Sequence, residues 1–434
     1  MPSDRRRFIG RSALAIGAAA ADAGWPAIAQ DAGLDMTARL GRDLAIHAGF
    51  GLKHSGGEGD HATADWTADR LRGAGYRVEV SAFDVPYFVR RRAELAISGR
   101  PVELLPQAPV LVTAPAGVSA PLAIVEEDGA VGDVRGRIAV FVAPFARHAA
   151  LFPTRGIGAT VQAIASAGAA AIVIVTSGPS GEACALNCPE DGPFVSVPLA
   201  ILAPKLADPV IAAARSGSEA TFVVDGDATH RPCRNVVARL ERGSDWIAMS
   251  TPRSGWFHCV AERGTGQAAF LEIADWLARE YPMHSVFLMN TGGHEYFFAG
   301  SHRILDQAPP PEKTRAWAHI GATLAARDAE EVDGRWRLLD RVDPERSTMA
   351  TEKAAGAVRS AFANLEGLSE PGLVRPQAGE LSAFTDMGFD KAFACIGLHR
   401  WFHTIGDTID CVDPALLAPV VRAHQETIRT LVAA

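Results

Sequence analysis

Two short segments of this chain combine an imidazole with a carboxylate at close spacing. In the sequence GGHE, His294 and Glu295 follow two glycines, and in the sequence WFHTIGDT, His403 precedes Asp407 by four residues. Carboxylate oxygens and imidazole nitrogens are ordinary zinc ligands, and a site with three of them leaves one position open for water. Because bound zinc lowers the pKa of that water and polarises a carbonyl group, these residue types point to metal-assisted hydrolysis.

Two further residues could join this group because each belongs to the end of a predicted strand. Glu262 lies in the loop behind the apolar segment DWIAMSTP, and His319 lies in residues 317–324, which are expected to form another strand. In open α/β sheets, ligands bind beyond the carboxyl ends of the strands. We therefore expect Glu262, Glu295 and His403 to converge in one cleft, with His319 as a candidate fourth ligand.

Each of these residues also has a purely structural interpretation. Glu262 could pair with Arg253 or Arg263 on its own loop. Glu295 could cap the helix expected after it, since acidic groups are stabilising near helix N-termini. His403 could bond a backbone carbonyl and nothing else. The sequence leaves these alternatives open.

The proton-transfer group is also open at this stage. Because the unperturbed pKa of histidine is near neutral, His294 could take a proton from metal-bound water. His294 could instead be a metal ligand, which would leave Glu295 as the base. Asp407 is expected to orient its loop, or to accept the second ring proton of His403, rather than to bind metal.

Apolar runs that alternate with helical patterns predict the scaffold that positions these loops. Such alternation is typical of an α/β domain with a mostly parallel, mixed sheet covered by helices on both faces. The expected helices cover residues 34–75, 158–168, 266–279 and 414–432, and the expected strands cover residues 76–85, 138–143, 171–175, 285–290 and 393–398.

The two segments with chemical potential together resemble one known family. GGHEYFFAGS followed by WFHTIGDTID resembles the co-catalytic zinc aminopeptidases, a group that includes glutamate carboxypeptidases and glutaminyl cyclases. The resemblance spans residues 40–430 and implies a zinc exopeptidase-like catalytic domain made of residues 34–114 and 226–434. Residues 115–225 contain GRIAVFV, SAGAAAIVIV and VSVPLAIL, an order that resembles an inserted protease-associated domain.

This resemblance implies roles for individual residues. Glu295 matches a metal-binding glutamate of the family, His403 matches its late metal-binding histidine, and Glu262 falls at its bridging acid. These three would form the acid, acid and imidazole set of a site for one zinc ion rather than two.

The chain departs from the family pattern at three positions, and the last two favour one zinc ion over two. His294 stands where the family has its general-base glutamate, and His319 lies near the fourth acidic ligand. Thr251 or Pro252 replaces an early metal-binding histidine.

The resulting functional prediction is a metal-dependent hydrolase that cleaves amide bonds in peptides or N-acyl amino acids. Its expected partner is a small peptide or an amino-acid-derived substrate. A single-zinc aminoacyl cyclase is one alternative, because cyclisation needs no water nucleophile. A non-catalytic binding protein is another, because the early histidine is missing. A serine hydrolase is disfavoured, since no Gly-x-Ser-x-Gly nucleophile elbow is present.

The N-terminus predicts export. Residues 1–29 carry three consecutive arginines, Arg5 to Arg7, then a short apolar run, and end in the small-residue sequence AIA, which are the parts of a secretory signal of the twin-arginine type. An uncleaved membrane anchor is the alternative, but the apolar run is short for one. We expect a periplasmic or secreted protein that has no membrane contact after cleavage.

Composition narrows the remaining classes. The 434 residues are 48% hydrophobic and 21% charged, which indicates a globular protein. A net charge of −8 without a basic stripe excludes a nucleic-acid partner. The six cysteines include no Cys-x-x-Cys pair, which disfavours a thiolate zinc site. Cys184 and Cys188 share one loop and could pair in an oxidising compartment, but spacing does not decide this.

Overall fold

The computed structural model describes residues 34–374 and 379–434, and Asp35–Ala434 form one compact unit. The predicted export signal, residues 1–29, lies outside the described residues and stays a prediction. Among the helices of the described ranges, none is both long enough and apolar enough to span a bilayer.

This unit is built around a 14-stranded mixed sheet. Four neighbouring strands at its centre run parallel in the order β16-β11-β9-β10, while β14 pairs antiparallel with β16 and β8 pairs antiparallel with β10. The bounds of these strands are Glu219–Leu240 for β8, Trp246–Pro252 for β9, Ser285–Thr291 for β10, Thr314–Ile320 for β11, Arg346–Ala350 for β14 and Ala392–Gly397 for β16.

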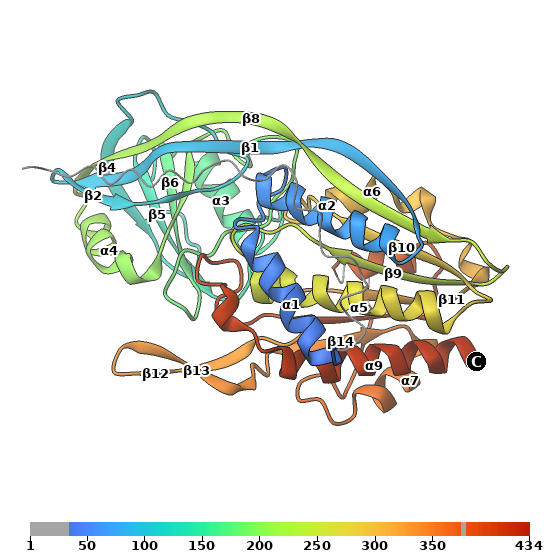
Figure 1. Ribbon diagram of the computed structural model, residues 1–434. Helices are drawn as coiled ribbons and strands as arrows, with labels where there is room; N and C mark the ends of the chain where they lie inside the picture. The colour runs from blue at the N-terminus through green and yellow to red at the C-terminus, as the bar shows by residue number, and fades with distance from the viewer. Residues whose placement is uncertain (1–33, 375–378) are drawn as a thin grey trace, which may run out of the picture. The chain divides into compact units, whose positions relative to one another are not determined.

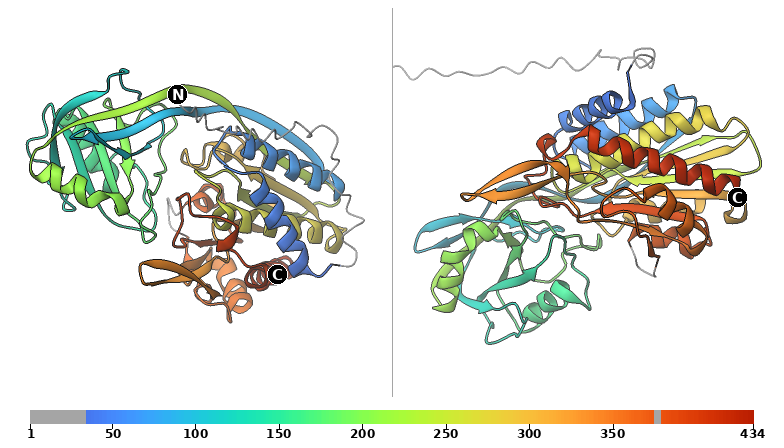
Figure 2. Two further views of the ribbon diagram at one scale, coloured as in Figure 1. Left: turned by 60° about the vertical axis from the view of Figure 1, so that its left-hand side comes forward. Right: turned by 90° about the horizontal axis from the view of Figure 1, so that it is seen from below.

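Helices cover both faces of this part of the sheet (Figures 1 and 2). One face packs against α1, α2, α5, α7 and α9, and the opposite face packs against α8. The bounds of the helices are Met36–Gly49 for α1, Glu58–Gly73 for α2, Thr265–Glu280 for α5, Glu352–Phe362 for α7, Glu380–Asp386 for α8 and Pro414–Ala433 for α9.

The middle of each central strand is apolar because both faces of the sheet are covered there. In β9, Ile247 and Met249 face the five-helix side and Ala248 faces the opposite side. This alternation follows from the two-residue period of a strand. The predicted fold class, an α/β domain with a mostly parallel sheet between helices, is confirmed.

Two long antiparallel strands connect the main sheet with residues 115–225. β1, Arg77–Ile97, pairs with β8 from Arg77 opposite Arg239 to Ile97 opposite Ala220. Figure 1 shows both strands running from the main sheet into the inserted segment.

The inserted segment has an α/β arrangement of its own. β4, β5, β6 and β7 are successive parallel neighbours, and α3 and α4 pack against them. The likeness of this segment to a protease-associated domain stays a prediction. The bounds are Val118–Val125 for β4, Ile138–Phe145 for β5, Gly156–Ser166 for α3, Ala171–Ser177 for β6, Leu199–Leu202 for β7 and Ala207–Arg215 for α4.

One expectation about the elements is wrong. The continuous helical segment predicted over residues 34–75 is two helices, α1 and α2, because Gly51 and Gly56 adopt positive φ angles of 73° that an α-helix does not contain. The loop between them carries Ser55 into the candidate site. All six cysteines, including Cys184 and Cys188, are free and buried, so the structure has no disulfide between these two residues.

Candidate active site

The predicted site residues lie in loops that leave neighbouring parallel strands. β9 leads to a π-helical turn, Val260–Gly264, which contains Glu262. β10 leads directly to Glu295, and β16 leads to His403. Because parallel strands end at the same sheet edge, side chains far apart in sequence meet there.

Glu262 and His403 lie in direct contact. His403 Nε2 is 3.3 Å from Glu262 Oε1, and both side chains are fully buried. His403 Nδ1 donates to the carbonyl of Ala185 at 2.9 Å, so Nε2 is the ring nitrogen with a free lone pair. The backbone of His403 adopts a φ of 58°, a left-handed conformation that is uncommon outside glycine and is found at functional sites.

Arg263 supplies a positive charge beside Glu262. Its Nη2 lies 2.9 Å from Glu262 Oε1, and both side chains are buried. Burial acts to raise the pKa of Glu262, but His403 and Arg263 lower that pKa below the ordinary value, so the carboxylate is ionised. The other pairing considered for Glu262 is absent, because Arg253 binds Asp60 at 2.8 Å.

Glu295 is held by two serines on one of its oxygens. Ser55 and Ser254 donate to Glu295 Oε2 at 2.6 and 2.9 Å, whereas Oε1 has no hydrogen-bond partner. Burial raises the pKa of Glu295, although Arg263 and the two serines act in the opposite direction. The carboxylate is therefore oriented through one oxygen while the other is left available.

His294 and His319 both face Glu380. His294 Nδ1 donates to Glu380 Oε2 at 3.0 Å, and His319 Nε2 lies 3.7 Å from the same oxygen. Burial lowers the pKa of His294 to about 4, with Arg263 adding to the effect and Glu380 opposing it. Although burial acts to raise the pKa of Glu380, the hydrogen bond from His294 and the charge of His319 hold it at about 2.

His319 has a different set of contacts from the other predicted ligands. Its Nδ1 pairs with Ser250 Oγ at 2.9 Å and its Nε2 faces Glu380, so the structure groups it with His294 rather than with Glu262 and His403. Thr251, which stands in place of the early histidine, donates to the carbonyl of Ile320 at 2.8 Å.

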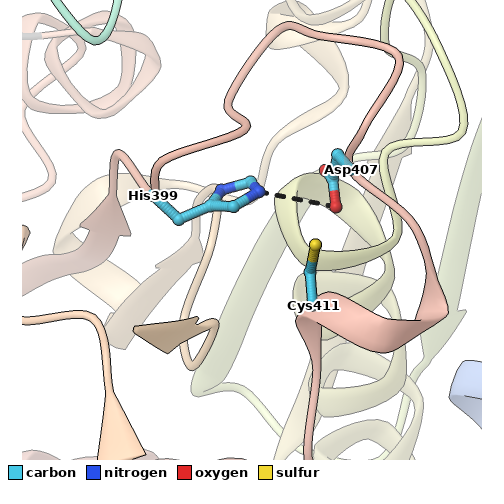
Figure 3. A group of neighbouring side chains, drawn as sticks. All are labelled: His399, Asp407 and Cys411. Carbon is cyan, nitrogen blue, oxygen red and sulfur yellow. Dashed lines mark ion pairs between the residues drawn. The ribbon is translucent and has the colours of Figure 1, made fainter. Parts of the chain in front are cut away.

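A second cluster consists of His399, Asp407 and Cys411 (Figure 3). Asp407 accepts hydrogen bonds from the backbone N–H groups of Ala261 and Glu262 at 2.7 and 2.9 Å. His399 Nε2 lies 3.5 Å from Asp407 Oδ1. Of the two roles predicted for Asp407, it therefore orients the chain, here at Glu262, while the ring proton of His403 goes to Ala185.

The second cluster has the spacing of a metal site. Among the described residues, His399, Asp407 and Cys411 are the three whose ligand atoms all lie within 4.8 Å of one another, whereas those of Glu262, Glu295 and His403 do not. Its chemistry fits a cation poorly, because both Asp407 oxygens already accept backbone hydrogen bonds. Burial and the charge of Asp407 raise the pKa of Cys411 to about 12, so its sulfur remains a thiol.

The first cluster fits a cation by its unused acceptors. Oε2 of Glu262, Oε1 of Glu295 and Nε2 of His403 are buried without a hydrogen-bond partner, while Oε1 of Glu262 has only its ion-pair contacts with Arg263 and His403. The two carboxylates, when both are ionised, carry one more negative charge than the guanidinium of Arg263 balances. Buried acceptors of this kind are costly unless a cation or a donor satisfies them. The residues present therefore fit one metal ion.

The inserted segment contacts this cluster through three residues. Ala185 bonds both the main chain and the ring of His403, and Cys188 N–H donates to the carbonyl of Glu295 at 3.0 Å. The ring of His148 stands edge-on to the ring of His403, with centroids 4.8 Å apart. Burial, aided by His403, lowers the pKa of His148 to about 3, so this ring is neutral.

Sequence reasoning missed several of these residues. Ser55, His148 and Glu380 belong to no recognised spacing motif, and each reaches the site from an element distant in sequence. Glu380 opens helix α8, and an acidic residue at a helix start reads as an ordinary helix-stabilising group. No signal in the sequence distinguished it.

A cavity of about 790 Å³ opens beside the cluster. Its walls come from the inserted segment, from the loops after β10 and β16, and from α8. Residues lining it include His148, Phe152, Arg155, Asn187, Arg263, His294, Phe297, Phe298, His302, His319, Met349, Glu380, Asp386, Ile396, Leu398 and Phe402. The cavity therefore brings the candidate base, the buried guanidinium and the inserted segment around one space.

Comparison with known proteins identifies the fold. Neither the models of protein families nor the curated proteins include a match by sequence. The zinc aminopeptidase BSAP from Bacillus subtilis matches in structure with a TM-score of 0.68 and 16% identity, over 91% of this chain and 94% of that chain. A peptidase M28 precursor from Shewanella amazonensis SB2B matches with a TM-score of 0.69 and 17% identity, over 92% and 95%.

An aminopeptidase from Aneurinibacillus sp. strain AM-1 matches with a TM-score of 0.66 and 16% identity, over 91% and 93% of the two chains. At these identities the likeness shows the fold alone. The chain has the fold of the zinc aminopeptidases, as the sequence resemblance implied.

Proposed function

We propose that this chain is an exported metal-dependent hydrolase of amide bonds that holds one zinc ion between Glu262, Glu295 and His403. The observation that carries the proposal is the set of buried acceptor atoms in these three side chains that have no hydrogen-bond donor. Leaving such atoms unpaired is costly, and a bound cation removes the cost. The zinc aminopeptidase fold supports the same proposal.

The metal, when bound, would polarise the scissile carbonyl group and activate a water molecule for attack. His294 is the proposed proton carrier. Its Nδ1–H is fixed on Glu380, so Nε2 is the ring atom that accepts a proton. With a pKa of about 4, lowered chiefly by burial, the ring is neutral near pH 7 and can accept a proton, although as a weak base.

The proposed substrates are small peptides or other amino-acid-derived molecules. The cavity of about 790 Å³ has the size of sites that enclose small-molecule ligands. We also propose twin-arginine export to the periplasm or beyond. N-terminal sequencing of the exported protein tests this: we expect cleavage near Ala29, and retention of residues 1–29 would contradict it.

Metal analysis of the purified protein, paired with a release assay on N-acyl amino acids and amino-acid amides, tests the hydrolase. We expect about one zinc ion per chain and hydrolysis that a chelator stops and zinc restores. Glu262→Gln should lose both properties. Glu272→Gln is the matched control, because Glu272 is also buried and bonded to an arginine, at 2.5 Å from Arg39, but lies outside the site.

Two results would contradict this proposal. Formation of pyroglutamate from glutaminyl peptides without hydrolysis would indicate the cyclase. Protein that contains no metal, takes up none and hydrolyses no amide would remove the hydrolase altogether.

One observation favours a second candidate, a non-catalytic binding protein. The guanidinium of Arg263 is 2.9 Å from Glu262, so the chain places its own cation where a metal ion would bind. Metal-free protein that binds a small ligand in the cavity without turnover would select this candidate.

A further inference from the structure

Arg263 presents an unused hydrogen-bonding group to the cavity. Its Nε donates to the carbonyl of Ser254 at 2.7 Å, which fixes the plane of the guanidinium. Nη2 forms an ion pair with Glu262 at 2.9 Å, whereas Nη1 has no hydrogen-bond partner. The side chain is 1% exposed and lines the cavity. A buried guanidinium with free N–H groups is prepared for an acceptor supplied by a ligand.

The cavity wall has equal numbers of acidic and basic side chains, and they differ in which of them are free to bind a ligand. Its described acidic lining residues are Glu380 and Asp386, and its arginines are Arg155 and Arg263. Glu380 already binds His294, Ser301 and Thr291. Asp386 lies on the exposed side of α8. Neither offers a buried, free carboxylate for the ammonium group of a peptide N-terminus.

Aromatic rings form the apolar part of the same cavity. Phe152 and Phe297 stack with centroids 4.9 Å apart and an interplanar angle of 7°. Phe298 and Phe402 also line the space. Such a wall takes an apolar or aromatic group next to the charged end.

We infer that the site recognises a substrate with a carboxylate beside its scissile bond and an apolar group, as in an N-acyl aromatic amino acid, and that Arg263 binds the carboxylate. This names the substrate class of the proposed hydrolase, so its consequences for turnover rest on that function, whereas its consequences for binding do not. The bidentate geometry of a guanidinium matches a carboxylate better than a neutral amide.

Calorimetric titration of the full chain with three related probes tests the inference. The probes are N-acetyl-L-phenylalanine, its neutral amide, and L-phenylalanine amide, which is a cation. Each is measured with protein as purified and after chelator treatment. We expect the acid to bind about tenfold more tightly than the neutral amide in both preparations, and the cation to bind weakest.

Arg263→Met should bring the acid-to-amide ratio to about one. Arg346→Met is the matched control, since Arg346 is also buried and also donates through Nε to a backbone carbonyl but does not line the cavity, and it should keep the preference. If the Arg263 variant does not fold, the comparison of probes on the wild-type chain still decides the question.

Three outcomes would overturn the inference: equal binding of acid and neutral amide, preference for the cation, or an acid preference that disappears on chelation and therefore belongs to the metal. A preserved acid preference without hydrolysis of any substrate would refute the proposed hydrolase and leave the recognition of a carboxylate standing. The two failures are thus distinguishable.

Discussion

The site contains two neighbouring buried clusters of carboxylate and imidazole groups, and the two clusters differ in how their carboxylates are hydrogen-bonded. In the first, Glu262, Glu295 and His403 retain acceptor atoms without donors. In the second, Asp407 has each oxygen occupied by a backbone N–H group, with His399 beside it. The two clusters therefore differ in their carboxylates, because both oxygens of Asp407 accept backbone hydrogen bonds, whereas each cluster has one histidine, His399 or His403, with an unpartnered Nε2.

A hydrogen bond also connects the two clusters. Asp407 binds the backbone N–H of Glu262, so the second cluster fixes the position of a ligand in the first. Groups that orient ligands in this way raise metal affinity without touching the metal. We therefore regard the first cluster as the proposed cation site and the second as its support.

The largest expected effect is the difference between substitutions of two histidines, His403 and His424, that have the same local hydrogen bonding. His403 and His424 are both buried, both bond a carbonyl through Nδ1, and both leave Nε2 unpartnered. Only His403 has a carboxylate at Nε2. His403→Asn should remove bound zinc and reduce kcat by about a thousandfold, since the activated water is lost, whereas His424→Asn should keep both. Metal analysis and amide-hydrolysis kinetics on the two variants provide the check, and equal effects would refute the distinction.

Asp407→Ala tests the support role. Removing a charged acceptor from two buried backbone N–H groups should lower the free energy of unfolding by about 3 kcal/mol and weaken zinc binding by about 10- to 100-fold. Denaturant unfolding and zinc titration measure the two quantities. Cys411→Ala should change neither zinc binding nor its stoichiometry. Loss of zinc in the Cys411 variant would move the metal to the second cluster.

Glu380→Gln tests how His294 is positioned. The amide can still accept the hydrogen bond from Nδ1–H but carries no charge, so kcat should fall by about 10- to 100-fold while zinc content stays unchanged. Steady-state kinetics with parallel metal analysis distinguish the two. An unchanged kcat would show that His294 is not the proton carrier, which would return that role to Glu295.

The smallest effect concerns acid stability away from both clusters. Burial lowers the pKa of His424 to about 4, although its bond to Val420 acts in the opposite direction. The folded state therefore binds fewer protons than the unfolded state between pH 6.5 and 4, so this contribution is complete above pH 6.5 and is lost as the pH falls through that window. At pH 5 the loss is about 2 kcal/mol.

His424→Asn should remove this pH dependence. We expect the stability difference between pH 7 and pH 5, measured by denaturant unfolding, to be smaller in the variant by that amount. Parallel curves for the two proteins would contradict the assignment.

The sequence predicted the frame of the molecule better than its site. Alternating apolar segments and helical patterns sufficed for the central strands and for α5 and α9, because both faces of the sheet are covered. The break between α1 and α2 was missed because glycine can adopt either sign of φ, and only the tertiary packing selects the positive one at Gly51 and Gly56.

Within the site, residues next to a motif could be found and residues supplied from a distance could not. His294, Glu295 and His403 lie in short segments with a family resemblance. Ser55 reaches Glu295 across 240 positions of the chain, and Glu380 reaches His294 across 86. Contacts of this kind depend on how loops pack at the sheet edge, which no local pattern encodes.

Anomalous diffraction from crystals of zinc-loaded protein, measured on both sides of the zinc absorption edge, shows directly whether zinc binds at the first cluster. We expect one zinc peak about 2.0–2.2 Å from His403 Nε2 and from oxygens of Glu262 and Glu295. A zinc peak between His399, Asp407 and Cys411, or no peak while Arg263 remains against Glu262, would contradict it.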